Sequence, residues 1–312
     1  MDFAYFKELE IKILEHPRLS EFTTFKLGGP CPLLFECENS EQLEAVIYGL
    51  REEGKEFMVI GQGSNLIVSD DGVNVDVIRY MTERPEIVRV GNDVFVSGAT
   101  LLDDLVLFCA KEGLEGMNYA SGIPGTVAGA IVGNAGAFGK QMADSLVGVD
   151  LLTPLTVEKR QAEPKELGFS YRESSLKSSG EIVLSAQLSL LKSEKYKLLE
   201  EREEILKMRR EKHPDYRAIP CAGSVFKNLE PSSSSERRQA AGWFLDQAGA
   251  KKFKVGGAAV FDKHANIIIK AKEDCLAKDV YDLMRKMISE VKVKFDIDLE
   301  PEVRLVGKFE EK

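Results

Sequence analysis

The sequence predicts a protein of mixed helices and strands that divides into two or three compact units. Its 312 residues are 44% hydrophobic, which is enough for a large core and more than one small domain requires. In the first half, short apolar runs typical of strands alternate with apolar positions at helical spacing. A charge-rich stretch at residues 193–213 then predicts a connecting helix, which Pro214 would stop.

The early elements can be assigned in order. Asn39 and Ser40 are good caps for a helix that Gly54 would end. Its inward face would be formed by Leu43, Val46, Ile47 and Leu50. Residues 57–60 then predict a buried strand, and residues 93–96 a second strand. The next helix would end at Gly113, with an inward face of Leu101, Leu102, Leu105, Val106 and Cys109.

The later elements are equally regular. Residues 182–191 carry apolar side chains at alternate positions, which predicts a strand with one solvated face. The charges of residues 193–213 are expected to lie on a solvated face, and residues 231–238 to form a flexible polar loop. A long helix is expected over residues 275–295. Its core stripe would be Leu276, Val280, Leu283, Met284, Met287, Ile288, Val291 and Phe295.

Composition excludes several classes of function. A net charge of −9 and a pI near 5.2 argue against binding to nucleic acid or to an anionic membrane. The five cysteines are widely spaced and never form a CxxC pair, so free thiols in a reducing compartment are expected. Three histidines offer no zinc-site spacing, and no metal is expected. The acidic, charge-interrupted N-terminus resembles neither a signal peptide nor a membrane span, which favours a cytoplasmic protein.

Residues 121–139, SGIPGTVAGAIVGNAGAFG, are the most unusual segment. Six glycines and four alanines in nineteen positions leave very little side-chain volume on the backbone. Glycine is favoured where φ is positive or where another group approaches the backbone closely. The segment is therefore either a tightly packed turn and helix or a cradle for a large phosphorylated cofactor.

A second glycine-containing segment, residues 61–66 (GQGSNL), directly follows the predicted strand at 57–60. Consecutive N–H groups in such a turn can form an anion-binding nest for a pyrophosphate. The dinucleotide-binding motif G-x-G-x-x-G fails because Leu66 stands at the third glycine, and Gln141 after Gly139-Lys140 excludes a Walker A loop. The alternative is a simple turn after the strand, with Asn65 capping its own backbone.

These segments, together with TTFKLGGP at 23–30, closely resemble the UDP-N-acetylenolpyruvoylglucosamine reductase family. The resemblance continues through four further stretches in the family's order: 169–177, 212–228, 257–266 and 299–307. It implies an α+β protein with a PCMH-type (vanillyl-alcohol-oxidase-like) FAD-binding domain over residues 20–192, in two subdomains of about 20–78 and 79–192. Residues 193–213 would be a connecting helix, and residues 214–307 a C-terminal α+β substrate-binding domain.

The resemblance also implies the chemistry. NADPH would reduce non-covalently bound FAD, and the enolpyruvyl group of UDP-N-acetylenolpyruvoylglucosamine would then be reduced to UDP-N-acetylmuramate for peptidoglycan synthesis. By their motifs, Ser224 would donate the proton, and Arg172 and Glu302 would stabilise the enolate. Of the two nearby glutamates, the motif favours Glu302 over Glu300. Tyr171, Lys212, Lys227, Asn228 and His264 are candidate substrate-binding residues. The implied cofactor-binding residues are Gly61, Gln62, Gly63, Ser64, Asn65, Leu66, Ser121, Gly122, Ile123, Pro124, Gly125, Asn134 and Ala135.

Some features depart from the family's pattern. Ala128, Gly133 and Lys270 replace residues that are usual there, so altered packing near the flavin and one altered contact are expected. The 52 positions from Arg172 to Ser224 resemble the branch that lacks an inserted substrate-capping loop with a tyrosine. The protein is expected to be a monomer. Two alternatives stay open: another FAD-dependent oxidase or dehydrogenase of the same fold superfamily, and a nucleotide-sugar-binding homologue without redox activity.

Overall fold

The computed structural model describes residues 3–231 and 238–309, which form two compact units. The first comprises the described residues up to Glu15, Leu33–Gln62 and Val75–Arg209. The second comprises His16–Pro32, Gly63–Asn74 and the described residues from Arg210 onward. The domain boundaries expected from the sequence remain predictions, because compact packing and division into functional domains are different criteria.

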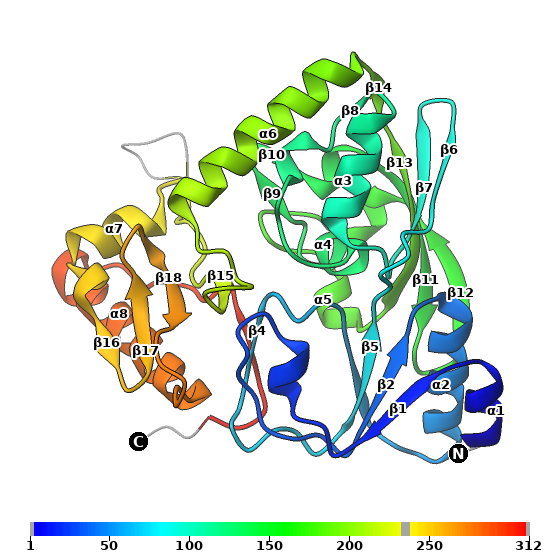
Figure 1. The fold of residues 1–312 in the computed structure, drawn as a ribbon, viewed down its shortest axis with the longest axis horizontal. Helices are drawn as coiled ribbons and strands as arrows, with labels where there is room; N and C mark the ends of the chain where they lie inside the picture. Colours follow the sequence, from blue (N-terminus) through cyan, green and yellow to red (C-terminus); the bar gives the residue numbers. More distant parts are fainter. Residues whose placement is uncertain (1–2, 232–237, 310–312) are drawn as a thin grey trace. The chain divides into compact units, whose positions relative to one another are not determined.

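The first unit begins with a four-stranded sheet (Figure 1). Its order is β1 (Lys12–Glu15), β2 (Leu33–Cys37), β5 (Asp76–Tyr80) and β3 (Phe57–Ile60), with β1 antiparallel and the others parallel. Helices α1 (Phe3–Glu8) and α2 (Ser40–Glu52) belong to the same part of the unit. The predicted cap is confirmed, because Asn39 accepts a hydrogen bond from the amide of Gln42, and the four predicted inward residues of α2 are buried.

A five-stranded antiparallel sheet forms the rest of the first unit, in the order β12-β11-β13-β7-β6. Its strands are β6 (Ile87–Val90), β7 (Asp93–Ser97), β11 (Leu146–Thr153), β12 (Glu158–Ala162) and β13 (Ile182–Ser189). Helices α3 (Leu102–Lys111) and α4 (Val127–Val132) share a core with this sheet. Shorter elements are β8 (Leu114–Glu115) paired with β14 (Leu191–Lys192), the hairpin of β9 (Gly136–Ala137) and β10 (Lys140–Gln141), and α5 (Leu176–Ser179).

The second unit contains a four-stranded antiparallel sheet and a two-stranded parallel pair. The sheet is β15 (Cys221–Ser224), β18 (His264–Lys270), β17 (Ala258–Phe261) and β16 (Lys254–Val255), in that order. Helices α7 (Ala241–Gln247) and α8 (Ala277–Phe295) pack on it and share its core. The pair consists of β4 (Leu66–Val68) and β19 (Arg304–Val306), so chain segments far apart in sequence lie side by side.

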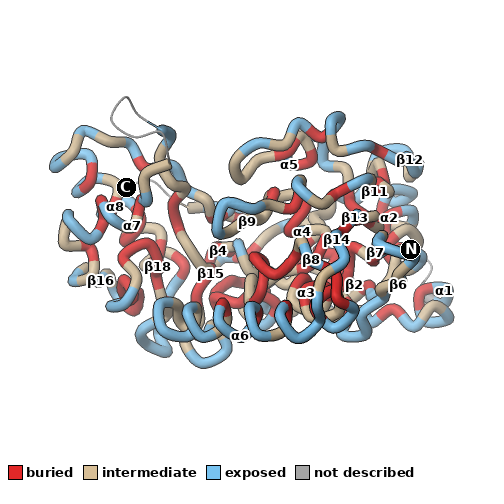
Figure 2. Tube along the Cα trace, turned by 90° about the horizontal axis from the view of Figure 1, so that it is seen from above, coloured by how far each residue is buried: buried red, intermediate tan, exposed pale blue. Residues whose placement is uncertain are grey.

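Helix α6 (Lys195–Lys212) confirms that a helix forms within residues 193–213 but differs in one respect from the expected solvated charge run. Figure 2 shows that much of its surface is exposed while some positions are buried. Arg202 is only 8% exposed, alongside the buried Leu198 and Ile205. One face of this helix therefore buries charge as well as apolar atoms.

Three further expectations need correction. Strand β13 buries neighbouring residues Val183 and Leu184 as well as the alternate positions, because its two faces pack into different cores: Val183 belongs to the core shared with α3 and α4, and Leu184 to the core that contains α2. Only Ile60 is buried in the edge strand β3. Leu276 is half exposed because it is the N-cap of α8 rather than part of its stripe. Of the predicted polar loop at 231–238, residues 232–237 lie outside the described residues.

The prediction of reduced thiols is confirmed, since all five cysteines lie within the described residues, are buried and form no disulfide. In residues 3–231 and 238–309, no helix combines the length and the apolar character that a membrane crossing requires.

Candidate functional site

In the first unit, Gly61 of one glycine-containing segment lies against Thr126 of the other. A Cβ on Gly61 would lie only 2.6 Å from Oγ1 of Thr126, so glycine is needed for this approach. Thr126 directly follows the 121–125 turn and caps α4 by accepting a hydrogen bond from the amide of Gly129. The end of β3 is thus placed against the start of α4, and two predicted cofactor-binding segments become neighbours.

Gly122 shows why part of the glycine run has no side chains. Its φ is +72°, its N–H donates to Oδ1 of Asp103 at 2.7 Å, and a Cβ there would lie 2.9 Å from Leu206 Cδ2 and 3.2 Å from Arg209 Cδ. The adjacent hydroxyl of Ser121 is buried and donates to the carbonyl of Asn118. At Gly61 and Gly122, close approach of the protein's own atoms explains the glycine. Within the run, the interpretation as a tightly packed turn therefore applies at Gly122, and the cofactor cradle stays a prediction for the other positions.

Asn134 connects the glycine run to the segment that carries Arg172. The Asn134 side chain is 1% exposed, and its Nδ2 donates to Oε1 of Gln141 at 2.9 Å and to the carbonyl of Ser170 at 2.8 Å. Its Oδ1 accepts a hydrogen bond from the amide of Ala143. Because the side chain is fully engaged with protein, any contact of Asn134 with a cofactor falls to its backbone.

The loop around Arg172 is held in a defined conformation. Ser174 Oγ donates to the carbonyl of Val132 at 2.7 Å, which is a second anchor on the glycine run. Arg172 itself has a φ of +57°, a left-handed conformation that costs a non-glycine residue energy and persists only when its surroundings enforce it. Its guanidinium carbon lies 5.6 Å from the centre of the Tyr171 ring. The hydrogen bonds of Ser170 and Ser174 therefore fix the backbone that carries this cationic side chain.

Arg209 is a candidate residue of the first unit that the sequence analysis missed. Asp103 binds both terminal nitrogens of Arg202, at 2.8 and 2.7 Å, and also the amide of Gly122. Arg209 lies beside the same glycine, and its buried Nε has no hydrogen-bond partner among the described residues. Burial lowers the pKa of Arg209; the nearby charge of Arg172 also lowers it, whereas Asp103 raises it.

The spacing of residues could have revealed Arg209. Leu198, Arg202, Ile205 and Arg209 follow one another at steps of four, three and four, so they share one face of α6. The two apolar residues of that face, Leu198 and Ile205, are buried. Arginines at the positions where a buried stripe continues are unusual, because a buried charge needs a partner. Arg202 has Asp103 as its partner, and the Nε of Arg209 has none among the described residues.

In the second unit, the backbones that carry Ser224 and Glu302 lie on adjoining chain segments. Ser224 ends β15 and follows Gly223, whose φ is +72°. The next carbonyl, that of Val225, accepts a 2.7 Å hydrogen bond from the amide of Glu302. Asn65 joins the same place, because its Nδ2 donates to the carbonyl of Glu302 at 3.0 Å. Three motifs that are far apart in sequence thus meet here, and Asn65 does so through Glu302 rather than by capping its own turn.

Lys227 and Glu300 form an ion pair next to Ser224 and Glu302. Lys227 Nζ lies 2.5 Å from Oε1 of Glu300, and the Lys227 amide donates to the Glu300 carbonyl at 2.9 Å. The lysine side chain is only 12% exposed, whereas the Glu300 side chain is 69% exposed. Glu300 is therefore engaged with Lys227. Asn228 accepts a hydrogen bond from the amide of Ala241, the first residue of α7.

His264 lies beside the candidate residue Lys212 and the adjacent His213. The rings of His213 and His264 are 5.1 Å apart and tilted by 48°. Nδ1 of His264 accepts a hydrogen bond from the amide of Asn266 at 3.3 Å, which leaves Nε2 as the protonated nitrogen of the neutral ring. Burial lowers the pKa of His264, a backbone hydrogen bond partly opposes this shift, and the charges of Lys251 and Lys212 lower the pKa further.

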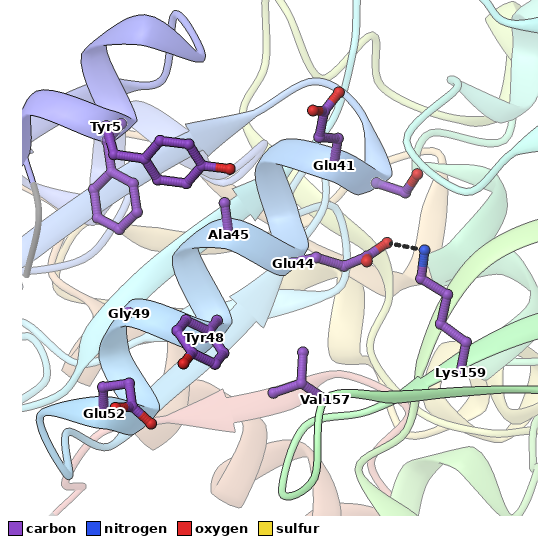
Figure 3. Close-up of a pocket in the computed structure, with 11 residues that line it drawn as sticks. Tyr5, Glu41, Glu44, Ala45, Tyr48, Gly49, Glu52, Val157 and Lys159 are labelled. Carbon is purple, nitrogen blue, oxygen red and sulfur yellow. Dashed lines mark ion pairs between the residues drawn. The ribbon is translucent and has the colours of Figure 1, made fainter.

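A cavity of about 760 Å³ in the first unit is lined by none of the predicted site residues. Figure 3 shows it between α1, α2 and β12, with Tyr5 and Tyr48 on its walls and the ion pair of Glu44 with Lys159 at one side. None of its lining residues belongs to the glycine-containing segments or to the segments that carry Ser224 and Glu302.

Comparison with known proteins gives matches along the chain. A family model described as an FAD binding domain matches residues 31–156. A second, described as the C-terminal domain of UDP-N-acetylenolpyruvoylglucosamine reductase, matches residues 213–306. The UDP-N-acetylenolpyruvoylglucosamine reductase of Alkaliphilus oremlandii is 36% identical over 96% of this chain and 94% of its own length. That of Lactobacillus acidophilus is 34% identical over 99% of both chains.

A solved structure is similar over the same extent. The crystal structure of UDP-N-acetylenolpyruvylglucosamine reductase (MurB) from Thermus caldophilus has a TM-score of 0.75 and 31% sequence identity, and the match covers 95% of this chain and 99% of that one. The match supports the expected α+β fold with a PCMH-like FAD-binding domain.

Proposed function

The chain belongs to the UDP-N-acetylenolpyruvoylglucosamine reductase family, and on that premise we propose specific roles for the residues described above. The protein is an FAD-dependent oxidoreductase of peptidoglycan synthesis with NADPH as its reductant. The observation that carries the assignment of residues is the hydrogen bond from the amide of Glu302 to the carbonyl of Val225, directly after Ser224. It holds the backbone of Glu302 against Val225, the residue that follows Ser224.

Two features of the first unit fit FAD. The guanidinium of Arg209 has a buried Nε without a protein partner among the described residues, and it lies next to Gly122 in a predicted cofactor-binding turn. A cation at this place suits an anionic or electron-rich part of a flavin nucleotide. We therefore assign the binding of FAD to residues 61–66, 121–125, the backbone of 134–135, and Arg209. Bound there, FAD supplies hydride transfer from NADPH to the enolpyruvyl double bond.

The remaining chemistry belongs to side chains of the protein. Addition of hydride to the alkene leaves negative charge as an enolate that extends into the substrate's carboxylate. We assign Arg172 and Glu302 to stabilisation of this charge, the arginine by direct electrostatic attraction. Glu302 can contribute only if its carboxyl group is protonated and donates a hydrogen bond, because an ionised carboxylate accepts hydrogen bonds but cannot donate them.

We assign the proton transfer to Ser224. A serine hydroxyl is a weak acid, so the transfer depends on short reach to the carbanion and on support for the resulting oxyanion. The ammonium of Lys227, three residues along the same segment and paired with Glu300, is a source of such support. Gly223, with its positive φ, lets the chain turn immediately before the serine.

The substrate's diphosphate needs cations or hydrogen-bond donors. Lys212 and His264 are assigned to it, because the neutral ring of His264 carries its proton on Nε2 and the two residues influence each other electrostatically. Tyr171 and Asn228 are further candidates for contact with the substrate. A monomeric enzyme in the cytoplasm, non-covalent FAD and the branch without an inserted loop complete the proposal.

The test follows flavin absorbance under anaerobic conditions. Addition of NADPH should bleach the flavin, and addition of UDP-N-acetylenolpyruvoylglucosamine should restore the oxidised spectrum with formation of UDP-N-acetylmuramate. Bleaching without recovery on addition of this substrate would contradict the assignment. Acid treatment should release the flavin from the polypeptide, whereas colour retained on the protein would show a covalent link.

A further inference from the structure

Asn266 holds both main-chain groups of one residue, Phe226, through its side chain. Its Oδ1 accepts a hydrogen bond from the amide of Phe226 at 3.0 Å, and its Nδ2 donates to the carbonyl of Phe226 at 2.8 Å. Asn266 is 3% exposed and Phe226 is 1% exposed, so water cannot easily replace either bond. Interchange of the amide's oxygen and nitrogen would set like groups against each other, so the orientation of this side chain is determined.

The contact replaces strand pairing at the point where β15 ends. Ser224 pairs with Ile267 of β18, and the register between the two strands shifts between Cys221 and Ser224. Beyond Ser224, the amide of Val225 donates to the carbonyl of Asn266 at 2.9 Å. The side chain of Asn266 then binds Phe226, where a regular strand would have used another residue's backbone. It therefore fixes the path of the chain as it leaves the sheet.

The opposite edge of the same segment is bound to the chain around Glu302. The Val225 carbonyl accepts from the amide of Glu302 at 2.7 Å, and Phe226 forms a bridge with Pro301. The segment 224–226 thus lies between Asn266 on one edge and residues 301–302 on the other. A shift of Phe226 on the side of Asn266 would move the serine and the glutamate relative to each other.

We propose that Asn266 is a positioning residue for Ser224 in the reductive step, which rests on the proton-donor role proposed for that serine. It acts through the main chain of Val225 and Phe226 and needs no contact with the substrate. The position requires a side chain of the length of asparagine that carries both a hydrogen-bond donor and an acceptor at its end. Aspartate would turn a second acceptor toward the Phe226 carbonyl, and leucine would leave both main-chain groups unpaired.

The test is a double-mutant cycle on reoxidation of NADPH-reduced enzyme by UDP-N-acetylenolpyruvoylglucosamine. Asn266→Leu should slow this step by about 100-fold, because a misplacement of about 1 Å can cost that much in an oriented reaction. In the Ser224→Ala background, the same change should slow the step by no more than about twofold, because the serine that Asn266 positions is already absent. A factor of about two is the usual error in such a comparison of mutational effects. A purely structural role would not produce this dependence on the serine.

Equal slowing by Asn266→Leu in both backgrounds would overturn the proposal. If the leucine variant does not fold, Asn266→Asp takes its place in the same cycle, because it keeps the acceptor for the Phe226 amide. Failure of the proposed function has a different signature: the wild-type flavin would not reoxidise with this substrate, or Ser224→Ala would be as fast as wild type.

Thr24→Val provides a matched control. The Thr24 hydroxyl is 4% exposed and donates to the carbonyl of Cys221 at 2.8 Å, so it binds the same strand at its other end. This variant should lower the temperature of thermal unfolding, as the Asn266 variants do, while its reoxidation rate stays within about twofold of wild type. Slowing like that of Asn266→Leu would show that any loosening of β15 reduces the rate.

Discussion

The side-chain amide of Asn65 donates a 3.0 Å hydrogen bond to the main-chain carbonyl of Glu302. The amide of Arg304 in turn donates to the carbonyl of Asn65, where β4 and β19 begin to pair. A residue of the predicted cofactor-binding loop therefore helps to fix the segment that carries a proposed catalytic glutamate. The coupling runs through the backbone and does not depend on the glutamate side chain.

We expect Asn65→Ala to reduce stability by about 1 kcal/mol, the usual net value of one hydrogen bond. It should also slow reoxidation of the reduced flavin by substrate, because the Glu302 segment loses one of its restraints. Urea unfolding and stopped-flow absorbance measure the two effects. Asn39→Ala, which removes the cap of α2 in the first unit, should lose comparable stability with no change in rate. Equal rates for Asn65→Ala and wild type would show that this restraint is unimportant.

Ser224→Ala should separate the two half-reactions. Flavin reduction by NADPH should be nearly unchanged, because it requires no proton from the serine. Reoxidation by the enolpyruvyl substrate should slow on the order of 10² or more, the usual loss when one general acid or charge-stabilising group is removed. Rapid-mixing absorbance follows both steps. Equal losses in the two half-reactions would argue against a proton donor at this position.

Arg209→Met should weaken FAD binding by roughly tenfold or more, since hydrogen bonds to charged groups contribute more than neutral ones. The flavin can be removed and titrated back, and the dissociation constant read from the quenching of its fluorescence. Lys207→Met is the control, because Lys207 is an exposed cation two positions away on the same helix. The two variants would bind FAD with the same affinity if Arg209 had no role in the cofactor site.

The sequence predicted those elements whose determinants are local. Asn39 and the stripe that begins at Leu43 define α2 within one short stretch, and the helix forms as expected. The burial of Val183 could not be inferred from alternation, because this residue packs into the core that β13 shares with α3 and α4, whereas its neighbour Leu184 packs into the core that contains α2. Both cores are formed by segments that are distant in sequence.

The candidate site shows the same limit. Motifs at 61–66, 224 and 302 identified the family, but no spacing along the chain indicated that Asn65 binds the carbonyl of Glu302. Arg209 was hidden within a run of charges that is usually solvated. Its significance depends on Gly122 and Asp103, which lie about a hundred residues earlier.

The lowered pKa of His264 predicts how stability depends on pH. Burial lowers the pKa of this ring in the folded protein, a backbone hydrogen bond opposes that shift, and Lys251 and Lys212 add to it, whereas in the unfolded chain the ring takes up a proton near its ordinary pKa of 6.5. Below that pH the unfolded state binds more protons, so this group lowers stability as the pH falls, and it has no effect well above 6.5.

His264→Gln removes the titrating group. Urea unfolding between about pH 8 and pH 5 should give a shallower loss of stability for this variant than for wild type. If His264→Gln and wild type lose stability in parallel, the ring is protonated equally in the folded and unfolded states.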